Sequence, residues 1–277
     1  MSEEIRDDEE ESDVSGLMCV LLTEESIRPD ERYLQAVERH CGEIDGKVDE
    51  HMAVAFHKTR VVQYEDAAIP SQTAIFVTDE PFSPQSCEDA LQQTYDWAQA
   101  ADTVARCRHG VLLTEMMAAG LEPSARLETF CGALQAALET YEVQALHWPI
   151  SQKVVAPSAF LDACANGAAL CAGPVNVRMF NIEGQEQDET VMDTLGMAPF
   201  FLPDLQCHFR GLDPGKVASF LFNTAQYLFD EGAVIEDGQT VSGIEADHRW
   251  PCQHEESIVP PQRIVLDVNP VPFGSPR

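Results

Sequence analysis

The residues best suited to metal chemistry form two Cys-x-His elements, Cys107–His109 and Cys252–His254. Residues two apart in a β-strand point to the same side of a sheet, so each element can present a thiolate and an imidazole together. If the two strands lay side by side, these four groups would make a tetrahedral zinc set. The same alternation equally well places buried cysteines and hydrogen-bonded histidines in a core. We therefore assign no metal and expect no cofactor.

Nucleophilic chemistry needs a serine or cysteine beside a base, and His147 is the base with such residues near it in sequence. The candidates are Ser151 and Cys164. Cys164 falls on the apolar face of its helix, which favours a packed and inert thiol. His147 and Trp148 end a strand and could line a cleft, although a Trp-Pro pair commonly serves packing and turns. No base–nucleophile geometry follows from the sequence, so no catalytic residue is assigned and an enzyme is the less favoured interpretation.

Arg178 is the most informative charged residue, because it lies inside an apolar strand of an acid-rich chain. A buried arginine needs a carboxylate partner, which predicts an internal ion pair or, as the alternative, an anion site. Asp204 and Asp237 are typical of turns, where carboxylates bond nearby backbone amides. His208 follows Cys207, and neighbours in a strand face opposite ways, so this pair is a weaker metal candidate. The candidate interaction or cleft residues are His147, Trp148, Arg178, Asp204, His208, Asp237 and Trp250.

The charge of the chain is its most unusual property, since 47 acidic and 17 basic residues give −30 at pH 7. Eight acids and one base fall in the first thirteen residues. Such a segment buries too little apolar surface to fold, so residues 1–15 are predicted to be a disordered acidic tail. The rest of the chain, at −23, argues against nucleic acid and membrane binding and favours a basic protein partner. An acidic surface adapted to salt or to genome composition is the alternative.

Motifs and cysteines narrow the class of protein further. The chain has no Walker loop, GxGxxG, GxSxG or HExxH, which excludes only the enzymes that carry those motifs. Its nine cysteines occur singly and mostly among apolar residues, which indicates buried thiols in a reducing compartment. No stretch approaches the ~18 apolar residues of a membrane span, and the acidic N-terminus lacks a secretory signal. We therefore expect a cytoplasmic protein.

Hydrophobic periodicity predicts the elements that must position these residues. Strands are expected at 17–23, 52–57, 59–64, 73–78, 104–114, 143–148, 175–182, 205–210, 249–255 and 263–268. Helices are expected from 30–41, 83–98, 123–141, 157–164, 190–195 and 213–231. Asp237-Gly238 indicates a hairpin over 234–241.

Successive strands without intervening helices indicate an α+β fold, with antiparallel or mixed sheets and packed helices. The element order over 17–115 is that of a ferredoxin-like unit. The string Val-Leu-Leu-Thr-Glu occurs at 20–24 and again at 111–115, which fits two ferredoxin-like-related halves or simply two similar buried strands. The predicted division is a disordered tail 1–15, an N-terminal half 16–116, a C-terminal half 117–269 and a flexible tail 270–277.

Several segments together resemble a bacterial family filed as domain-of-unknown-function family 4261. They are 109–115, 145–149 with Ser151 and Gln152, 176–181, 192–196, 202–209, 223–229, 236–241 and 249–255. The resemblance covers about residues 17–268. It implies a stand-alone cytoplasmic protein, with some members encoded near secretion and toxin systems, and it supplies no catalytic residues.

The function expected from this pattern is that of an acidic, cytoplasmic protein-binding module. Its specific form would be an immunity protein that neutralises a basic toxin of a type VI secretion system. Two alternatives stay open: a hydrolase or metal-dependent enzyme with a cleft near His147, Trp148, Arg178 and His208, and a homo-oligomeric scaffold.

Overall fold

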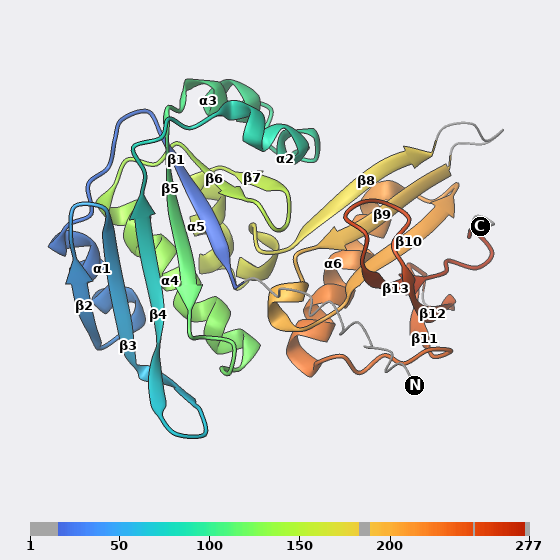
Figure 1. The fold of residues 1–277 in the computed structure, drawn as a ribbon. Coiled ribbons are helices and arrows are strands. Elements are labelled where there is room, and N and C mark those ends of the chain that lie inside the picture. Colours follow the sequence, from blue (N-terminus) through green and yellow to red (C-terminus); the bar gives the residue numbers. More distant parts are fainter. Residues whose placement is uncertain (1–15, 183–188, 246, 275–277) are drawn as a thin grey trace, which may run out of the picture.

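The computed structural model describes residues 16–182, 189–245 and 247–274, and Figure 1 shows their arrangement. The predicted disordered tail 1–15 lies outside the described residues, as do residues 275–277 of the predicted flexible tail. Residues 270–274 contact the second sheet, where the backbone N–H of Arg210 donates to the carbonyl of Phe273 over 3.0 Å.

The first sheet has seven strands in the order β2-β3-β4-β5-β1-β6-β7, and every neighbouring pair is antiparallel. Its strands are β1 (Met18–Thr23), β2 (Ile44–Val48), β3 (Met52–Gln63), β4 (Ala68–Val77), β5 (His109–Met116), β6 (Ala145–Trp148) and β7 (Lys153–Val155). The apolar run of β1 lies at the centre, where Leu21 is opposite Val111 on one side and Leu146 on the other. All three side chains are buried, so the predicted core strand is confirmed.

Five helices accompany this sheet. They are α1 (Glu31–Cys41), α2 (Glu88–Gln92), α3 (Ala100–Arg106), α4 (Pro123–Thr140) and α5 (Pro157–Ala165). Asp30 begins α1 by accepting a hydrogen bond from the N–H of Arg32, and prolines open α4 and α5, where a missing N–H costs nothing. Helices α1 and α4 pack against each other over one face of the sheet.

The second sheet has six strands in the order β11-β12-β13-β10-β9-β8. They are β8 (Asn176–Ile182), β9 (Glu189–Leu195), β10 (Asp204–Arg210), β11 (Thr240–Ser242), β12 (Arg249–Glu256) and β13 (Ile264–Val268). Strands β10 and β13 are parallel, and the other neighbours are antiparallel. Helix α6 (Pro214–Glu231) packs against β8, β9 and β10 through a buried stripe that includes Val217, Leu221 and Leu228.

The α+β class is confirmed, but the first half does not pair its strands as a ferredoxin-like unit does. That arrangement would place the first strand between the third and the fourth. Here β5 lies between β4 and β1, and β6, which comes later in the chain, takes the second side of β1. Residues after 116 therefore complete the first sheet. The division into halves at 16–116 and 117–269 stays a prediction, and the chain passes from one sheet to the other between residues 155 and 176.

Three local predictions were wrong. Residues 190–195 form strand β9 rather than a helix. The prediction failed because nearly all side chains of β9 are buried, so the sequence lacks the alternation of apolar and polar residues that marks a strand. The expected helix 83–98 is a 3-10 turn at Pro84–Cys87 followed by α2, and a separate helix, α3, covers the start of the expected strand 104–114. Gly238 does turn the chain, with φ +81°, but β11 pairs with β12 instead of with residues 234–237. Strands β2 and β7 were not predicted.

One continuous apolar core joins the two sheets, with buried residues of β1, α4, β9, α6 and β13 in the same cluster. Near its middle, the indole of Trp148 lies between Phe130 and Phe160, with ring centroids 5.6 and 6.3 Å away. Within the described residues, no helix is long and apolar enough to cross a membrane.

Candidate functional site

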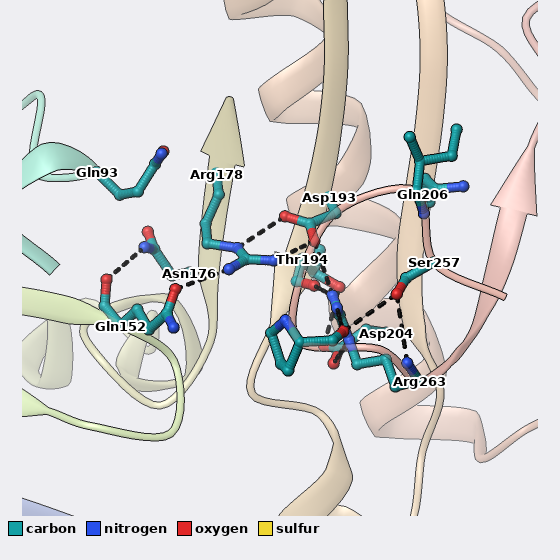
Figure 2. A network of polar contacts seen from close by, with 12 residues as sticks. Gln93, Gln152, Asn176, Arg178, Asp193, Thr194, Asp204, Gln206, Ser257 and Arg263 are labelled. Atoms are coloured by element: carbon teal, nitrogen blue, oxygen red, sulfur yellow. Dashed lines mark hydrogen bonds and ion pairs between the residues drawn. The ribbon is translucent and has the colours of Figure 1, made fainter. Parts of the chain in front are cut away.

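A buried network of charged side chains lies where the second sheet meets the β6–β7 turn (Figure 2). Arg178 on β8 stands directly opposite Asp193 on β9. Its Nε donates to Asp193 Oδ1 over 2.9 Å and its Nη2 to Oδ2 over 2.5 Å, while Nη1 donates to Gln152 Oε1 over 2.7 Å. Both charged side chains are fully buried. The ion pair predicted for Arg178 is therefore confirmed.

A second arginine, Arg263, enters the same network from the segment before β13. Its Nη2 donates to Asp193 Oδ2 over 2.8 Å and its Nε to Asp204 Oδ2 over 2.9 Å. Burial raises the pKa of Asp204, and the neighbouring Arg263 opposes that rise. Asp204 Oδ1 also accepts from the N–H of Met197 over 3.1 Å, so its predicted turn role is confirmed in part. Two arginines and two carboxylates leave the network neutral.

This network joins the two sheets rather than forming a reaction centre. Asn176 Nδ2 donates to the carbonyl of Gln152 over 3.1 Å, beside the Arg178 contact to the same residue. On the next part of β8, Gln93 bonds both backbone groups of Met179, accepting from its N–H over 3.0 Å and donating to its carbonyl over 3.4 Å. Because the carboxylate oxygens bind guanidinium groups, neither Asp193 nor Asp204 is free to act as a base.

A second buried ion pair reinforces the same junction. Arg126 on α4 pairs with Glu115 on β5, and its Nη1 donates to the carbonyl of Pro199. Glu115 also accepts from the N–H of Leu17 over 2.9 Å. The guanidinium of Arg126 lies 5.9 Å from the ring centroid of Phe200, in a cation–π contact. Neither charge stands out in the sequence, since each lies at a helix or strand position where exposed charges are common.

The residues considered for nucleophilic catalysis do not form a base–nucleophile pair. Ser151 donates its hydroxyl to the carbonyl of Gly173 over 2.5 Å. Burial lowers the pKa of His147 to about 4, so its imidazole is neutral near pH 7. Cys164 lies half-buried on α5 and contacts Cys131 instead. The remaining member of the proposed cleft, His208, lies 3.2 Å from Glu189, Nε2 to Oε2.

The two Cys-x-His elements do not come together. Cys107 ends α3 and His109 begins β5 in the first sheet, whereas Cys252 and His254 lie on β12 in the second. Over the three described ranges, no group of three or more His, Cys, Asp or Glu side chains could hold a metal ion. The alternative zinc set is therefore not assembled by these residues.

Asp237 and Trp250 make contacts that hold the segment around β11 in place. The carboxylate of Asp237 accepts from the N–H of His254 over 2.7 Å and lies 2.8 Å from its Nδ1. These contacts, the backbone one first, lower the pKa of Asp237. Asp237 lies in a turn as predicted, but the backbone amide that it binds belongs to β12 and not to the turn. Trp250 is buried and makes an edge contact with Phe220 on α6, with ring centroids 4.8 Å apart.

Asp267 on β13 carries a buried carboxyl whose ionisation opposes folding. It stands opposite Gln206 and accepts from its Nε2 over 3.1 Å. Burial raises the pKa of Asp267 to about 6, against its hydrogen bond from Gln206. A carboxyl with a raised folded-state pKa contributes stability at low pH that is lost as the pH rises through that value.

We expect Asp267→Asn to stabilise the protein at pH 7 by about 2–3 kcal/mol, because the amide keeps the oxygen that accepts from Gln206 and removes the buried charge. The gain should shrink as the pH falls from 6 towards the ordinary carboxyl range, where the wild-type side chain is protonated in both states. Urea unfolding at pH 7 and near pH 4 measures it, with the exposed Asp66→Asn as the control. An equal gain at both pH values would contradict the assignment to ionisation.

A groove of about 1000 Å³ lies between α6 and β11. One side is formed by α6, including Phe220, Asn223 and Tyr227, and the other by residues 239–245. Lys216 and Glu245 join the two sides through an ion pair of 3.2 Å. The lining mixes apolar side chains with hydroxyl and amide groups, which suits a peptide better than a purely apolar ligand.

β11 is an edge strand, and its outer side presents free backbone positions to this groove. The carbonyl of Gln239 accepts from the N–H of Cys252 on β12 over 2.9 Å, and the N–H of Gly243 donates to the carbonyl of His248, just before β12, over 3.2 Å. Because antiparallel strands alternate between residues that bond a partner strand and residues that face away, the backbone groups of Thr240 and Ser242 point away from β12. Both residues are exposed and line the groove.

The other sheet edges are protected. The edge of β8 is covered by Gln93 and by Tyr95, whose hydroxyl donates to the carbonyl of Met179 over 3.4 Å. Helix α2 packs against β7, and β2 carries the charged side chains Asp45 and Lys47, which discourage strand addition. The edge of β11 differs from these three in lying beside a groove.

The segment that lines the groove carries a net negative charge, and its charged residues on the lining itself are Asp213, Lys216 and Glu245. Residues 213–247 contain seven acids and a single base, Lys216. All seven acids are exposed: Asp213, Asp230, Glu231, Glu236, Asp237, Glu245 and Asp247. A basic segment would therefore be attracted to this side of the molecule.

Comparison with known families finds one match. Residues 193–269 are similar to the family described as Domain of unknown function (DUF4261). The predicted resemblance is confirmed there, and its extension to residues 17–192 stays a prediction. No curated protein and no solved structure matches the chain.

The DUF4261 region contains much of the second sheet and all of the groove. It begins at Asp193, includes Asp204 and Arg263 of the buried network, and spans β10, α6, β11, β12 and β13. The residues that line the groove, 213–245, all lie within it. The other strand of the Arg178 ion pair, β8, precedes it.

Proposed function

We propose that this protein is a protein-binding module that takes an extended, basic segment of a partner protein along the groove between α6 and β11. The observation that carries the proposal is the open edge of β11, where Thr240 and Ser242 direct backbone groups away from β12 beside a groove of about 1000 Å³. An extended peptide can add to such an edge as a further strand, with affinity from main-chain hydrogen bonds.

The side chains of the groove would add selectivity to that backbone pairing. Tyr227 and Val234 are exposed apolar groups on the lining, and alternate side chains of an added strand would face them. The seven exposed acids of residues 213–247 would attract lysine and arginine side chains and speed the encounter at low salt. A basic protein with an exposed or disordered segment is the expected partner.

The predicted form of such a module is a cytoplasmic immunity protein that neutralises a basic toxin of a secretion system. The acidic groove supports this form, since occlusion of a basic surface segment would block a toxin that uses it to bind an acidic substrate. The residues that the sequence suggested for hydrolytic or metal-dependent chemistry, His147, Trp148, Arg178 and His208, do not line this groove.

The proposal is tested with a fluorescent, end-blocked peptide of alternating lysine and valine, measured by anisotropy against the full chain at low salt. We expect saturable binding that weakens as salt is added, and no binding of the matched peptide of alternating glutamate and valine. Ser242→Pro removes an outward N–H at an edge position that tolerates proline. It should weaken binding about tenfold or more, whereas Ser242→Ala should not.

A charge variant separates the groove from the rest of the acidic surface. Glu236→Lys, beside the groove, should weaken binding of the lysine–valine peptide. Glu50→Lys, in the β2–β3 turn of the other sheet, should leave that binding unchanged. Equal effects of the two reversals, or binding that ignores Ser242→Pro, would overturn the groove as the site. A self-associating chain whose dimer buries β11 would also overturn it in favour of the homo-oligomeric alternative.

A further inference from the structure

Two cysteines from different helices meet beside a cavity on the other side of α6 from the groove. The thiol of Cys131 on α4 donates a hydrogen bond to the sulfur of Cys164 on α5. Both line a cavity of about 410 Å³, together with Gln135 of α4 and Phe229 of α6. A small reagent in this cavity can therefore reach a pair of sulfur atoms that are already in contact.

The two sulfurs differ in exposure and in protonation. Cys131 is buried, whereas Cys164 is half-buried. The hydrogen bonds that Cys164 accepts from Cys131 and Gln135 lower its pKa, and the same thiol–thiol contact, followed by burial, raises the pKa of Cys131. All nine cysteines lie within the described ranges, and the other seven have raised pKa values. Cys164 is thus the more accessible sulfur of the pair and the cysteine whose pKa is lowered.

We infer that Cys164 and Cys131 form a peroxide-reactive pair, in which Cys164 is the attacking thiolate and Cys131 the resolving thiol. The sulfur of Cys164 attacks one oxygen of a hydroperoxide, the O–O bond breaks, and the products are a sulfenic acid on Cys164 and hydroxide or an alkoxide. The thiol of Cys131 then attacks that sulfenic sulfur, a disulfide forms, and water leaves with the proton of Cys131. Both sulfurs are oxidised and the peroxide is reduced.

The arrangement satisfies what each step needs. Attack requires a sulfur that a peroxide can reach and that loses its proton readily, and Cys164 lines the cavity and has a lowered pKa. Resolution requires a second sulfur within contact distance, and the hydrogen bond from Cys131 places one beside Cys164. A third sulfur, Cys41 of α1, lies beside Gly132, the residue that follows Cys131, so the peptide map must also follow Cys41.

The test treats the reduced full chain with a stoichiometric amount of hydrogen peroxide, blocks the remaining thiols, and maps the peptides by mass spectrometry. We expect a Cys131–Cys164 disulfide that dithiothreitol reverses. The internal control is Cys171, which is also half-buried but whose pKa burial raises to about 11. Cys164 should be consumed about tenfold faster or more than Cys171.

Two variants assign the roles of the sulfurs. In Cys131→Ser the sulfenic acid on Cys164 should persist and be trapped by dimedone, and in Cys164→Ser neither the adduct nor the disulfide should form. Circular dichroism checks that both variants fold. Oxidation of Cys164 no faster than of Cys171, or a disulfide from Cys164 to Cys41 in place of Cys131, would overturn the inference.

Discussion

Asp193→Ala is expected to lower the free energy of unfolding by about 3–5 kcal/mol, the usual cost of removing one partner of a buried ion pair. The carboxylate of Asp193 accepts from Arg178 on one side and from Arg263 on the other, and its side chain is fully buried. Alanine would leave both guanidinium groups without this partner, at a place where water cannot replace it. Urea unfolding followed by circular dichroism measures the loss.

The matched control is Glu128→Ala, which breaks an ion pair of similar length on the surface. Arg60 Nη2 and Glu128 Oε2 are 2.6 Å apart, and both side chains are solvent-accessible. Exposed pairs of this kind contribute little, so the control should change stability far less. Equal losses in the two variants would mean that the buried network does not hold the second sheet to the β6–β7 turn.

Gly196→Ala is expected to destabilise the protein by about 3–5 kcal/mol, through strain and collision together. Gly196 follows β9 with φ +124°, a conformation that L side chains rarely adopt. A Cβ there would lie 2.0 Å from the carbonyl oxygen of Pro174 and 3.2 Å from the Cβ of Ser151. The segment that leads into β8 would have to move away, which would disturb the contacts between the two sheets.

Gly211→Ala separates the two contributions to that loss. Gly211 also has a positive φ, +71°, but nothing lies within 4 Å of the position that a Cβ would take. The control therefore carries only the conformational cost, about 1 kcal/mol. The free energies of unfolding of both variants, from the same denaturant titration, decide the point. A Gly196 variant no less stable than the Gly211 variant would contradict the close approach of Pro174.

The sequence predicted those features that depend on local pattern. The apolar run of β1 predicted a core strand, and the arginine inside an apolar strand predicted an internal ion pair. Neither prediction required the pairing segment to be known, and the structure confirms both. The same pattern failed at residues 190–195. Nearly every side chain of β9 is buried, including Asp193. Its sequence therefore lacks a strand alternation and indicates a short helix that ends at Gly196.

The candidate site was harder to predict, because it depends on pairing between distant segments. The Asp237-Gly238 motif located the turn correctly. It did not predict that β11 pairs with β12, and this pairing determines which edge of β11 is open. Cys131 and Cys164 lie on different helices, and no local sequence pattern predicts how those two helices pack against each other. The Cys-x-His elements show the opposite failure, since their similar spacing suggested a shared site and the two sheets separate them.

The most direct measurement of the central claim is amide hydrogen exchange of residues 239–243, with and without saturating lysine–valine peptide. If an extended basic segment adds to the edge of β11, exchange at the outward amides of Thr240 and Ser242 slows when the peptide binds. The amides of Gln239 and Gly243, already bonded within the chain, change little. Binding that leaves Thr240 and Ser242 exchanging as before, with protection elsewhere, would contradict the proposed function.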